Sequence, residues 1–132
     1  VTSPAFGSTE EDVKARIEKL LAVKGNTSAE QFHKRLGKLM WDNVGLERSK
    51  ESLEKAIREL KILREDFWKN INVPGTDKGI NSELEKAERV ADYIELARLM
   101  AFDALNRNES CGAHFRTEFQ TEDGEAKRND EE

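Results

Sequence analysis

The residues best suited to chemistry lie together between positions 106 and 116, in the segment NRNESCGAHFR. This segment holds the only cysteine, Cys111, and one of the two histidines, His114. A thiol and an imidazole three residues apart suggest either a metal site or a cysteine nucleophile. The second histidine, His33, lies far away in the sequence.

Neither kind of site is complete. A zinc site needs three or four protein ligands, and Cys111 with His114 supplies at most two. A cysteine nucleophile needs a base and an orienting group around a thiol of lowered pKa, and no orienting group is evident nearby. We therefore predict no metal ligand, and we favour a small, partly buried cysteine in a turn over a thiol enzyme. For His33 we expect an exposed or half-buried position on a helix.

Phosphate and dinucleotide sites are also absent from the sequence. The segment GTDKG at 75–79 follows no predicted strand and lacks the Gly-Lys-Ser/Thr of a phosphate-binding loop. No G-x-G-x-x-G occurs, so the usual dinucleotide cradle at a helix N-terminus is missing. We predict no catalytic and no cofactor-binding residue in this chain.

The elements that position the segment are helices, indicated by apolar residues three and four positions apart. They are expected at 9–24, 28–42, 49–72 and 82–105. Their starts carry capping residues: Thr9, Ser28 with Gln31, Ser49 and Asn81. Trp41 extends the stripe of the second helix, and core or groove packing is expected for Trp41 and Trp68.

The end of the fourth helix differs from its beginning. Between positions 96 and 105 only Arg98 and Asp103 are charged, and Leu99, Met100 and Phe102 point away from the main apolar stripe. A helix that is apolar nearly all round is buried on more than one side. Either the first helix covers this second face, or a missing partner does.

Composition sets the fold class. The chain has 132 residues, 37% charged side chains, two prolines and a net charge of −5, which favours solvated helices and disfavours nucleic-acid binding. No apolar run approaches the roughly 20 residues that span a bilayer, and no signal peptide is present, so we expect a soluble chain without membrane insertion. One cysteine fits a reducing compartment. The predicted fold is all-α: an antiparallel, spectrin-repeat-like three-helix bundle with an additional N-terminal helix. We expect an irregular segment at 1–8, one helical domain at 9–119 and a polar, disordered tail at 120–132.

Three segments resemble one flavoprotein family. ESCGAHFR at 109–116 resembles the Glu-Ser-Arg-Gly-Ala-His-x-Arg signature of the succinate dehydrogenase and fumarate reductase flavoprotein subunits, to which L-aspartate oxidase is related. The region 36–65 is similar to the family's Met-x-x-x-Val-Gly-x-x-Arg segment and the long helix after it. The region 84–110 is similar to its last long helix.

The resemblance implies that the chain is the C-terminal helical domain of such a subunit. The parent would bind FAD in a Rossmann-like domain, interconvert succinate and fumarate beneath a capping domain, and exchange electrons with an iron–sulfur subunit and quinone. The parent complex would lie on the cytoplasmic face of the inner membrane. Within this chain the resemblance implies an interface with the flavin and capping domains, formed by Glu109, Ser110, Cys111, Gly112, Ala113, His114 and Arg116. Gly112 would permit close backbone approach, and His114 and Arg116 would supply hydrogen bonds. Cys111 stands where the family pattern has arginine.

Other assignments stay open, and one of them is the equivalent domain of L-aspartate oxidase. The chain could be a free-standing acidic helical bundle that recruits a partner through the apolar end of its fourth helix. The weaker alternative is a small thiol enzyme centred on Cys111 and His114.

Overall fold

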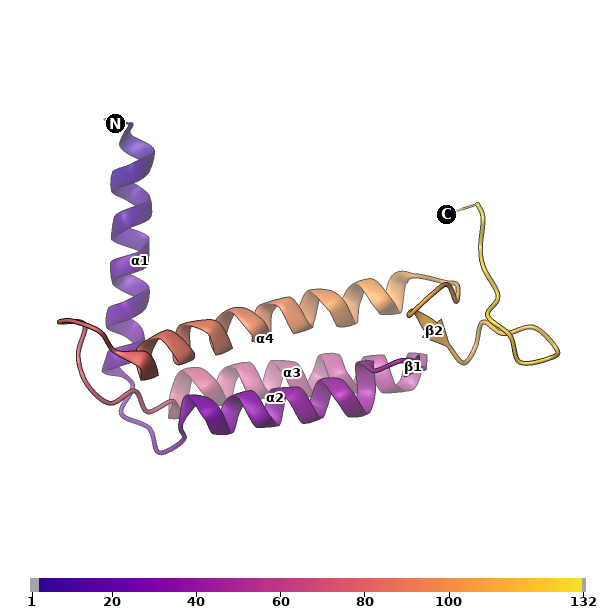
Figure 1. Cartoon of the computed structure of the whole chain (residues 1–132), viewed down its shortest axis with the longest axis horizontal. Coiled ribbons are helices and arrows are strands. Elements are labelled where there is room, and N and C mark those ends of the chain that lie inside the picture. Colours follow the sequence, from indigo (N-terminus) through magenta and orange to yellow (C-terminus); the bar gives the residue numbers. More distant parts are fainter. Residues whose placement is uncertain (1–2, 132) are drawn as a thin grey trace.

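Three helices lie side by side in an antiparallel bundle, and a fourth stands away from one end of it (Figure 1). The structure is a computed structural model that describes residues 3–131. Its elements in chain order are α1 (Pro4–Ala22), α2 (Ala29–Val44), β1 (Glu47–Arg48), α3 (Lys50–Asn70), α4 (Ser82–Asn106) and β2 (Phe115–Arg116). The all-α prediction is confirmed, with one addition: β1 and β2 form a two-stranded parallel pair at the far end of the bundle.

The core lies between α2, α3 and α4, where the predicted stripes meet. On α3 the buried residues are Leu53, Ala56, Leu60, Leu63 and Phe67. On α4 they are Leu84, Ala87, Val90, Ala91, Ile94, Ala97, Ala101 and Ala104. The small alanines let α4 approach its neighbours closely, and the rings of Phe32 and Phe67 fill the centre, edge to face at 5.2 Å.

Local capping chemistry sets three of the helix starts as predicted. Ser28 and Gln31 form the expected capping box on α2, and Ser49 caps α3. Asn81 caps α4 by accepting the backbone N–H groups of Glu83 and Leu84. Each of these contacts spans at most three residues, which is why the sequence alone locates them.

The irregular segment predicted at 1–8 is wrong from residue 4 onward. Helix α1 begins at Pro4, with Ser3 as its N-cap, so Thr9 lies inside the helix and its hydroxyl donates to the Ala5 carbonyl. Proline suits the first helical position because its missing N–H has no partner there and its φ is already helical. Residues 1 and 2 lie outside the described part of the chain.

The link between α1 and α2 passes against the end of α3. Gly25 N–H donates to the Ile71 carbonyl at 3.2 Å, and Thr27 and Asn72 complete a short ladder of backbone hydrogen bonds. A Cβ on Gly25 would lie 1.9 Å from the backbone oxygen of Asn70. Only glycine permits this close approach.

The tail beyond residue 120 is hydrogen-bonded rather than disordered, which corrects the prediction for 120–132 over its described residues. Thr121 N–H donates to the Glu125 carbonyl, and Lys127 N–H to the Phe119 carbonyl. The tail thus turns back on itself and returns to the end of α4. Its polar composition reflects exposed side chains, while several of its backbone groups have partners within the chain.

Trp41 differs from expectation, and the exposed end of α4 decides between the two alternatives given above. Trp41 is 82% exposed, because it follows Leu36 by five residues and therefore points about 140° away from the buried face. Trp68 is partly buried as expected, with its ring against Phe67 and under the ammonium group of Lys19. On α4, Leu99 and its neighbours stay exposed, so α1 does not cover the second apolar face.

Among residues 3–131, no helix has the length and apolar character to cross a membrane.

Candidate functional site

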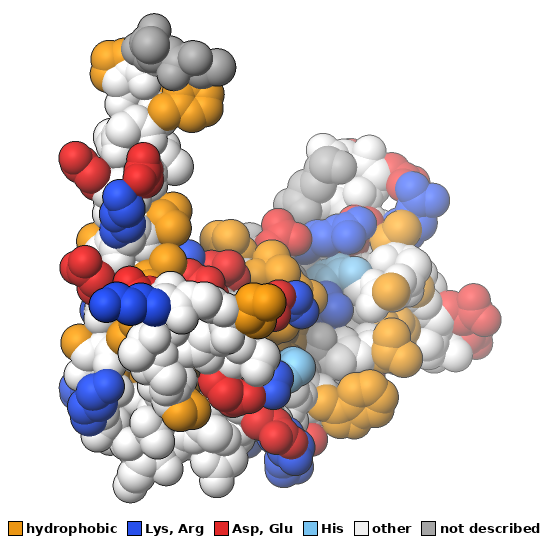
Figure 2. All heavy atoms as spheres, turned by 60° about the vertical axis from the view of Figure 1, so that its left-hand side comes forward, with side chains coloured by type: hydrophobic (Ala, Val, Ile, Leu, Met, Phe, Trp, Pro, Cys, Tyr) orange, Lys and Arg blue, Asp and Glu red, His pale blue; other side chains and the backbone are white. Residues whose placement is uncertain are grey.

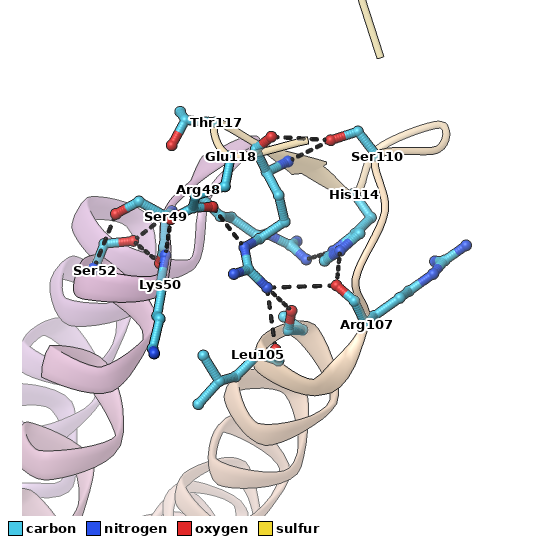
Figure 3. Close-up of polar contacts among 12 residues, drawn as sticks. Arg48, Ser49, Lys50, Ser52, Leu105, Arg107, Ser110, His114, Thr117 and Glu118 are labelled. Atoms are coloured by element: carbon cyan, nitrogen blue, oxygen red, sulfur yellow. Dashed lines mark hydrogen bonds and ion pairs between the residues drawn. The ribbon is translucent and has the colours of Figure 1, made fainter. Parts of the chain in front are cut away.

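The segment 106–116 forms a compact polar cluster where the ends of α3 and α4 meet (Figure 3). After α4 ends, the chain makes a tight turn at Cys111–His114, closed by reciprocal hydrogen bonds between the backbones of these two residues at 2.8 and 3.1 Å. Gly112 occupies the first central position with φ of +58°, and no other residue of the turn has positive φ. Glycine adopts this conformation without the steric cost of a Cβ.

Ser110 fastens this turn to β2. Its side chain is fully buried, and its hydroxyl both accepts the backbone N–H of Arg116 at 2.8 Å and donates to the Arg116 carbonyl at 3.1 Å. One hydroxyl thereby satisfies both backbone groups of one residue. An alanine at this position would remove the partner of the Arg116 N–H, whereas the Arg116 carbonyl would still accept the N–H of Phe119 at 2.9 Å.

Arg116 closes the C-terminal end of α4. The residue is 3% exposed, and its Nη1 donates to the carbonyls of Ala104 at 3.0 Å, Leu105 at 3.1 Å and Arg107 at 3.4 Å. The last carbonyls of a helix have no partner within it and carry the negative end of the helix dipole. The buried guanidinium of Arg116 donates to these carbonyls and also places a positive charge at the negative end of the dipole.

Glu118 closes the N-terminal end of α3, as Arg116 closes the C-terminal end of α4. Its carboxylate accepts the backbone N–H of Lys50 and, at 3.1 Å, the Nε–H of Arg116. Burial alone would raise the pKa of Glu118, but these hydrogen bonds outweigh it and lower the pKa overall. The ion pair of Arg116 and Glu118 therefore joins the negative pole of α4 to the positive pole of α3.

His114 is held between two fixed groups. Arg48 Nη1 lies 2.9 Å from its Nδ1, and the Arg107 carbonyl lies 3.4 Å from its Nε2. Because an arginine only donates, Nδ1 must accept and the proton must sit on Nε2, so the imidazole is neutral. Burial lowers the pKa of His114, and the charges of Arg48, Arg107 and Arg116 lower it further, against the opposing effect of the Arg107 carbonyl.

Glu109 connects the cluster to the tail. Its carboxylate accepts the backbone N–H of Asn129 at 3.1 Å and the Nε–H of Arg107 at 2.7 Å. These hydrogen bonds lower its pKa. The adjacent Ser110 N–H donates to the Lys127 carbonyl at 2.8 Å, so the tail is fixed at two neighbouring points.

The polar cluster offers little for catalysis or metal binding. Both ring nitrogens of His114 are occupied, which leaves no free base for the Cys111 thiol. Within residues 3–131, no three His, Cys, Asp or Glu side chains converge as metal ligands. His33 lies exposed on α2, as predicted. Its ring lies near that of Tyr93. In the same part of the chain, every buried side-chain nitrogen or oxygen has a hydrogen-bond partner.

The seven residues predicted as an interface fall into two groups. Glu109, Ser110, His114 and Arg116 are buried and bonded within the chain, whereas Gly112 and Ala113 are exposed at the tip of the turn and Cys111 is intermediate. The sequence reasoning did not single out Arg48, Glu118 or the tail. Arg48 closes the Met-x-x-x-Val-Gly-x-x-Arg segment at 40–48, and that position was the available signal.

Comparison with known proteins extends over nearly the whole chain. The family model described as "Fumarate reductase flavoprotein C-term" matches residues 33–132. The succinate dehydrogenase flavoprotein subunit of Bacillus subtilis is 33% identical over 123 residues, which are 91% of this chain and 20% of that subunit. The fumarate reductase flavoprotein subunit of Proteus vulgaris is 30% identical over 112 residues, 85% of this chain and 19% of that subunit. The chain therefore spans about a fifth of the length of these curated relatives.

The fold is shared with solved structures. A chain of the quinol fumarate reductase of E. coli superposes with a TM-score of 0.80 at 25% identity. The superposition covers 98% of this chain and 21% of that one. It therefore includes α1 and the tail as well as the bundle.

Proposed function

Because the chain belongs to the fumarate reductase flavoprotein C-terminal family, we propose that it is the C-terminal helical domain of a flavoprotein subunit that interconverts succinate and fumarate. The observation that carries this proposal is the family match over residues 33–132, which contains both the 40–48 segment and the 109–116 signature. The names of the relatives, succinate dehydrogenase and fumarate reductase flavoprotein subunits, support the same reaction.

In this proposal the chain contributes structure and the parent contributes chemistry. FAD and the dicarboxylate bind to upstream domains of the same polypeptide, and an iron–sulfur subunit passes electrons between the flavin and quinone. The parent complex is peripheral on the cytoplasmic face of the inner membrane. The buried side chains of the polar cluster favour this division, since their polar atoms are already hydrogen-bonded within the chain.

The polar cluster serves, in the same proposal, as one edge of the contact with the flavin and capping domains. The turn tip at Gly112 and Ala113 supports this role, because both residues are exposed and a Cβ added at Gly112 would meet nothing within 4 Å. The buried members, including Arg116 and His114, fix the turn relative to the ends of α3 and α4.

The direct test is to express the full-length polypeptide that the gene encodes and to measure bound flavin and fumarate reduction with a reduced artificial donor. We expect a flavin-containing protein with this activity, and no activity from the 132-residue chain alone. A full-length protein without flavin, or an active isolated chain, would contradict the proposal.

The contribution of the turn is tested by Ala113→Trp in the full-length protein, with Ile80→Trp as the matched control on the exposed α3–α4 loop. We expect reduced flavin retention or activity for the first variant only. Helicity by circular dichroism should be unchanged in both. Equal behaviour of the two variants would remove the turn from the interface.

A further inference from the structure

Most of α1 has no partner within the chain. All residues from 3 to 15 are exposed, and only the last two turns of the helix pack on the bundle, through partly buried Ile17 and buried Leu20. Figure 2 shows the helix standing clear of the rest of the molecule. A free helical segment of about a dozen residues has marginal stability in water, so this one requires a covering surface.

The exposed part of α1 continues the stripe that anchors it. Phe6, which is 63% exposed, and Val13 precede Ile17 and Leu20 by helical spacings of seven, four and three residues, so the four lie on one side. The lower half of the stripe is buried against the bundle. The upper half of the stripe, formed by Phe6 and Val13, is also apolar and is exposed to solvent.

A second uncovered apolar face lies on α4, beside the base of α1. Arg16 of α1 pairs with Asp92 at 2.5 Å, and Leu96 and Leu99 follow Asp92 on the same side of α4. Leu99 is 68% exposed, and its neighbours Met100 and Phe102 are exposed as well. Of the two charged residues between 96 and 105, Arg98 is already paired with Glu95 at 2.8 Å.

The two faces meet where α1 leaves the bundle. We name this surface the α1–α4 corner, formed by Phe6, Val13, Leu96, Leu99, Met100 and Phe102. Trp41, by contrast, lies next to the ion pair of Lys38 and Asp42. Exposed apolar side chains gathered on adjoining helix faces mark an interaction site.

We propose that the α1–α4 corner is the docking surface for the upstream, flavin-carrying part of the same polypeptide. The proposal rests on the function proposed above and specifies where the contact is made. In the Bacillus subtilis relative the match covers 20% of the subunit, and the family is described as C-terminal, so most of such a subunit precedes the matched region. That portion reaches this domain through the free end of α1.

This occupant fits the geometry and the chemistry. A partner attached to the tip of α1 is held next to the corner at high effective concentration, so a modest apolar surface suffices for stable docking. The scarcity of charged residues between positions 96 and 105 of α4 suits a permanent contact, because obligate interfaces are more apolar than transient ones. In this arrangement α1 is a connecting helix that gains its missing partner when the upstream part packs against it.

The test is hydroxyl-radical footprinting of the 132-residue chain and of the full-length protein, read residue by residue by mass spectrometry. We expect the modification rates of Phe6, Leu99, Met100 and Phe102 to fall roughly fivefold in the full-length protein, as for side chains moved into an interface core. Trp41 and Ile62, which are exposed on α2 and α3, should react equally in both proteins. Equal rates at the corner, or protection of Trp41 and Ile62 instead, would overturn the proposal.

A matched pair of variants sharpens the result. In the full-length protein Leu99→Glu should restore the reactivity of Phe6 and Met100, whereas Ile62→Glu should leave them protected. Protection of the corner in the isolated chain that rises with protein concentration would identify a second copy as the occupant and would also overturn the proposal.

Flavin content, measured on the same full-length preparation, separates this inference from the function on which it rests. Bound flavin with an unprotected corner contradicts the docking surface alone. A full-length protein without flavin contradicts the proposed function.

Discussion

Two regions around α4 face opposite demands. Beyond its C-terminal end, Ser110, His114 and Arg116 form the buried part of the polar cluster, and every buried side-chain nitrogen and oxygen in residues 3–131 has a partner. On the outer face of α4 between residues 96 and 102, and along the Phe6–Val13 stripe of α1, apolar side chains are exposed. The buried residues of the family signature are thus bonded within the chain, whereas the apolar surface has no partner among the described residues. The signature therefore contains groups that hold this domain together, and the exposed apolar surface is where we propose that a partner docks.

The strongest test of the comparison is Arg116→Ala in the 132-residue chain. It removes three hydrogen bonds from the end of α4 and leaves Glu118 without its buried cation. We expect a loss of about 3 kcal/mol in the free energy of unfolding, measured by urea denaturation. Arg98→Ala, which removes an exposed pair with Glu95, should cost under about 0.5 kcal/mol. Similar small losses for both would show that the cluster is not what stabilises this end.

Ser110→Ala should have a smaller effect of the same kind. The buried N–H of Arg116 loses its partner, whereas the Arg116 carbonyl keeps the N–H of Phe119, and we expect a cost of about 1.5 kcal/mol in denaturation experiments. Ser8→Ala is the matched control, because its hydroxyl donates to the Ala5 carbonyl on the exposed surface. A control that costs as much as Ser110→Ala would argue against the importance of burial.

The neutral imidazole predicts a pH dependence that is specific to the cluster. The pKa of His114 in the folded chain lies below its unfolded value of about 6.5. Its contribution to stability is therefore complete above about pH 6.5 and is lost as the pH falls toward the folded pKa. Glu109 and Glu118, whose pKa values are also lowered, add a separate loss below about pH 4.5.

Denaturation midpoints between pH 7 and pH 5 measure the histidine effect. Replacing His114 by Gln should flatten the profile in this window, and His33→Gln should not, since that ring is exposed. An unchanged profile in His114→Gln would assign the dependence to other groups.

The smallest effect on stability is expected at the apolar surface. Leu99→Glu in the 132-residue chain should change the free energy of unfolding by less than about 0.5 kcal/mol, because the position is exposed and both residues are good helix formers. Ile94→Glu, on the buried face of the same helix, should prevent folding. If Leu99→Glu destabilises the isolated chain strongly, the outer face of α4 is covered within the chain and the comparison fails.

Local signals in the sequence account for most of the bundle. The cap at Ser28, the stripe from Leu53 to Phe67 and the stripe of α4 depend on residues within a few turns of each other, so spacing alone reveals them. Trp41 shows the limit of this approach. Whether a residue at the edge of an apolar stripe is buried depends on how far the helix is rotated about its axis, and residue spacing does not fix that rotation. The early start of α1 was missed because Ser3 and Pro4 resemble an irregular segment as much as a helix N-terminus.

The candidate site was only half predictable. The sequence located the segment 109–116 and its family by the identity and order of its residues. It did not show which way those side chains point, and the buried ones contact groups elsewhere in the chain.

What the sequence determined by itself is therefore the helices, their caps and the family. Only the tertiary structure decided that the signature is bonded inward and that the α1–α4 corner is bare. His114 and Arg48 are 66 positions apart, and the tail reaches Glu109 from 20 residues downstream. A hydrogen bond depends on distance and direction between two atoms, and no pattern along the chain encodes these until packing brings the partners together.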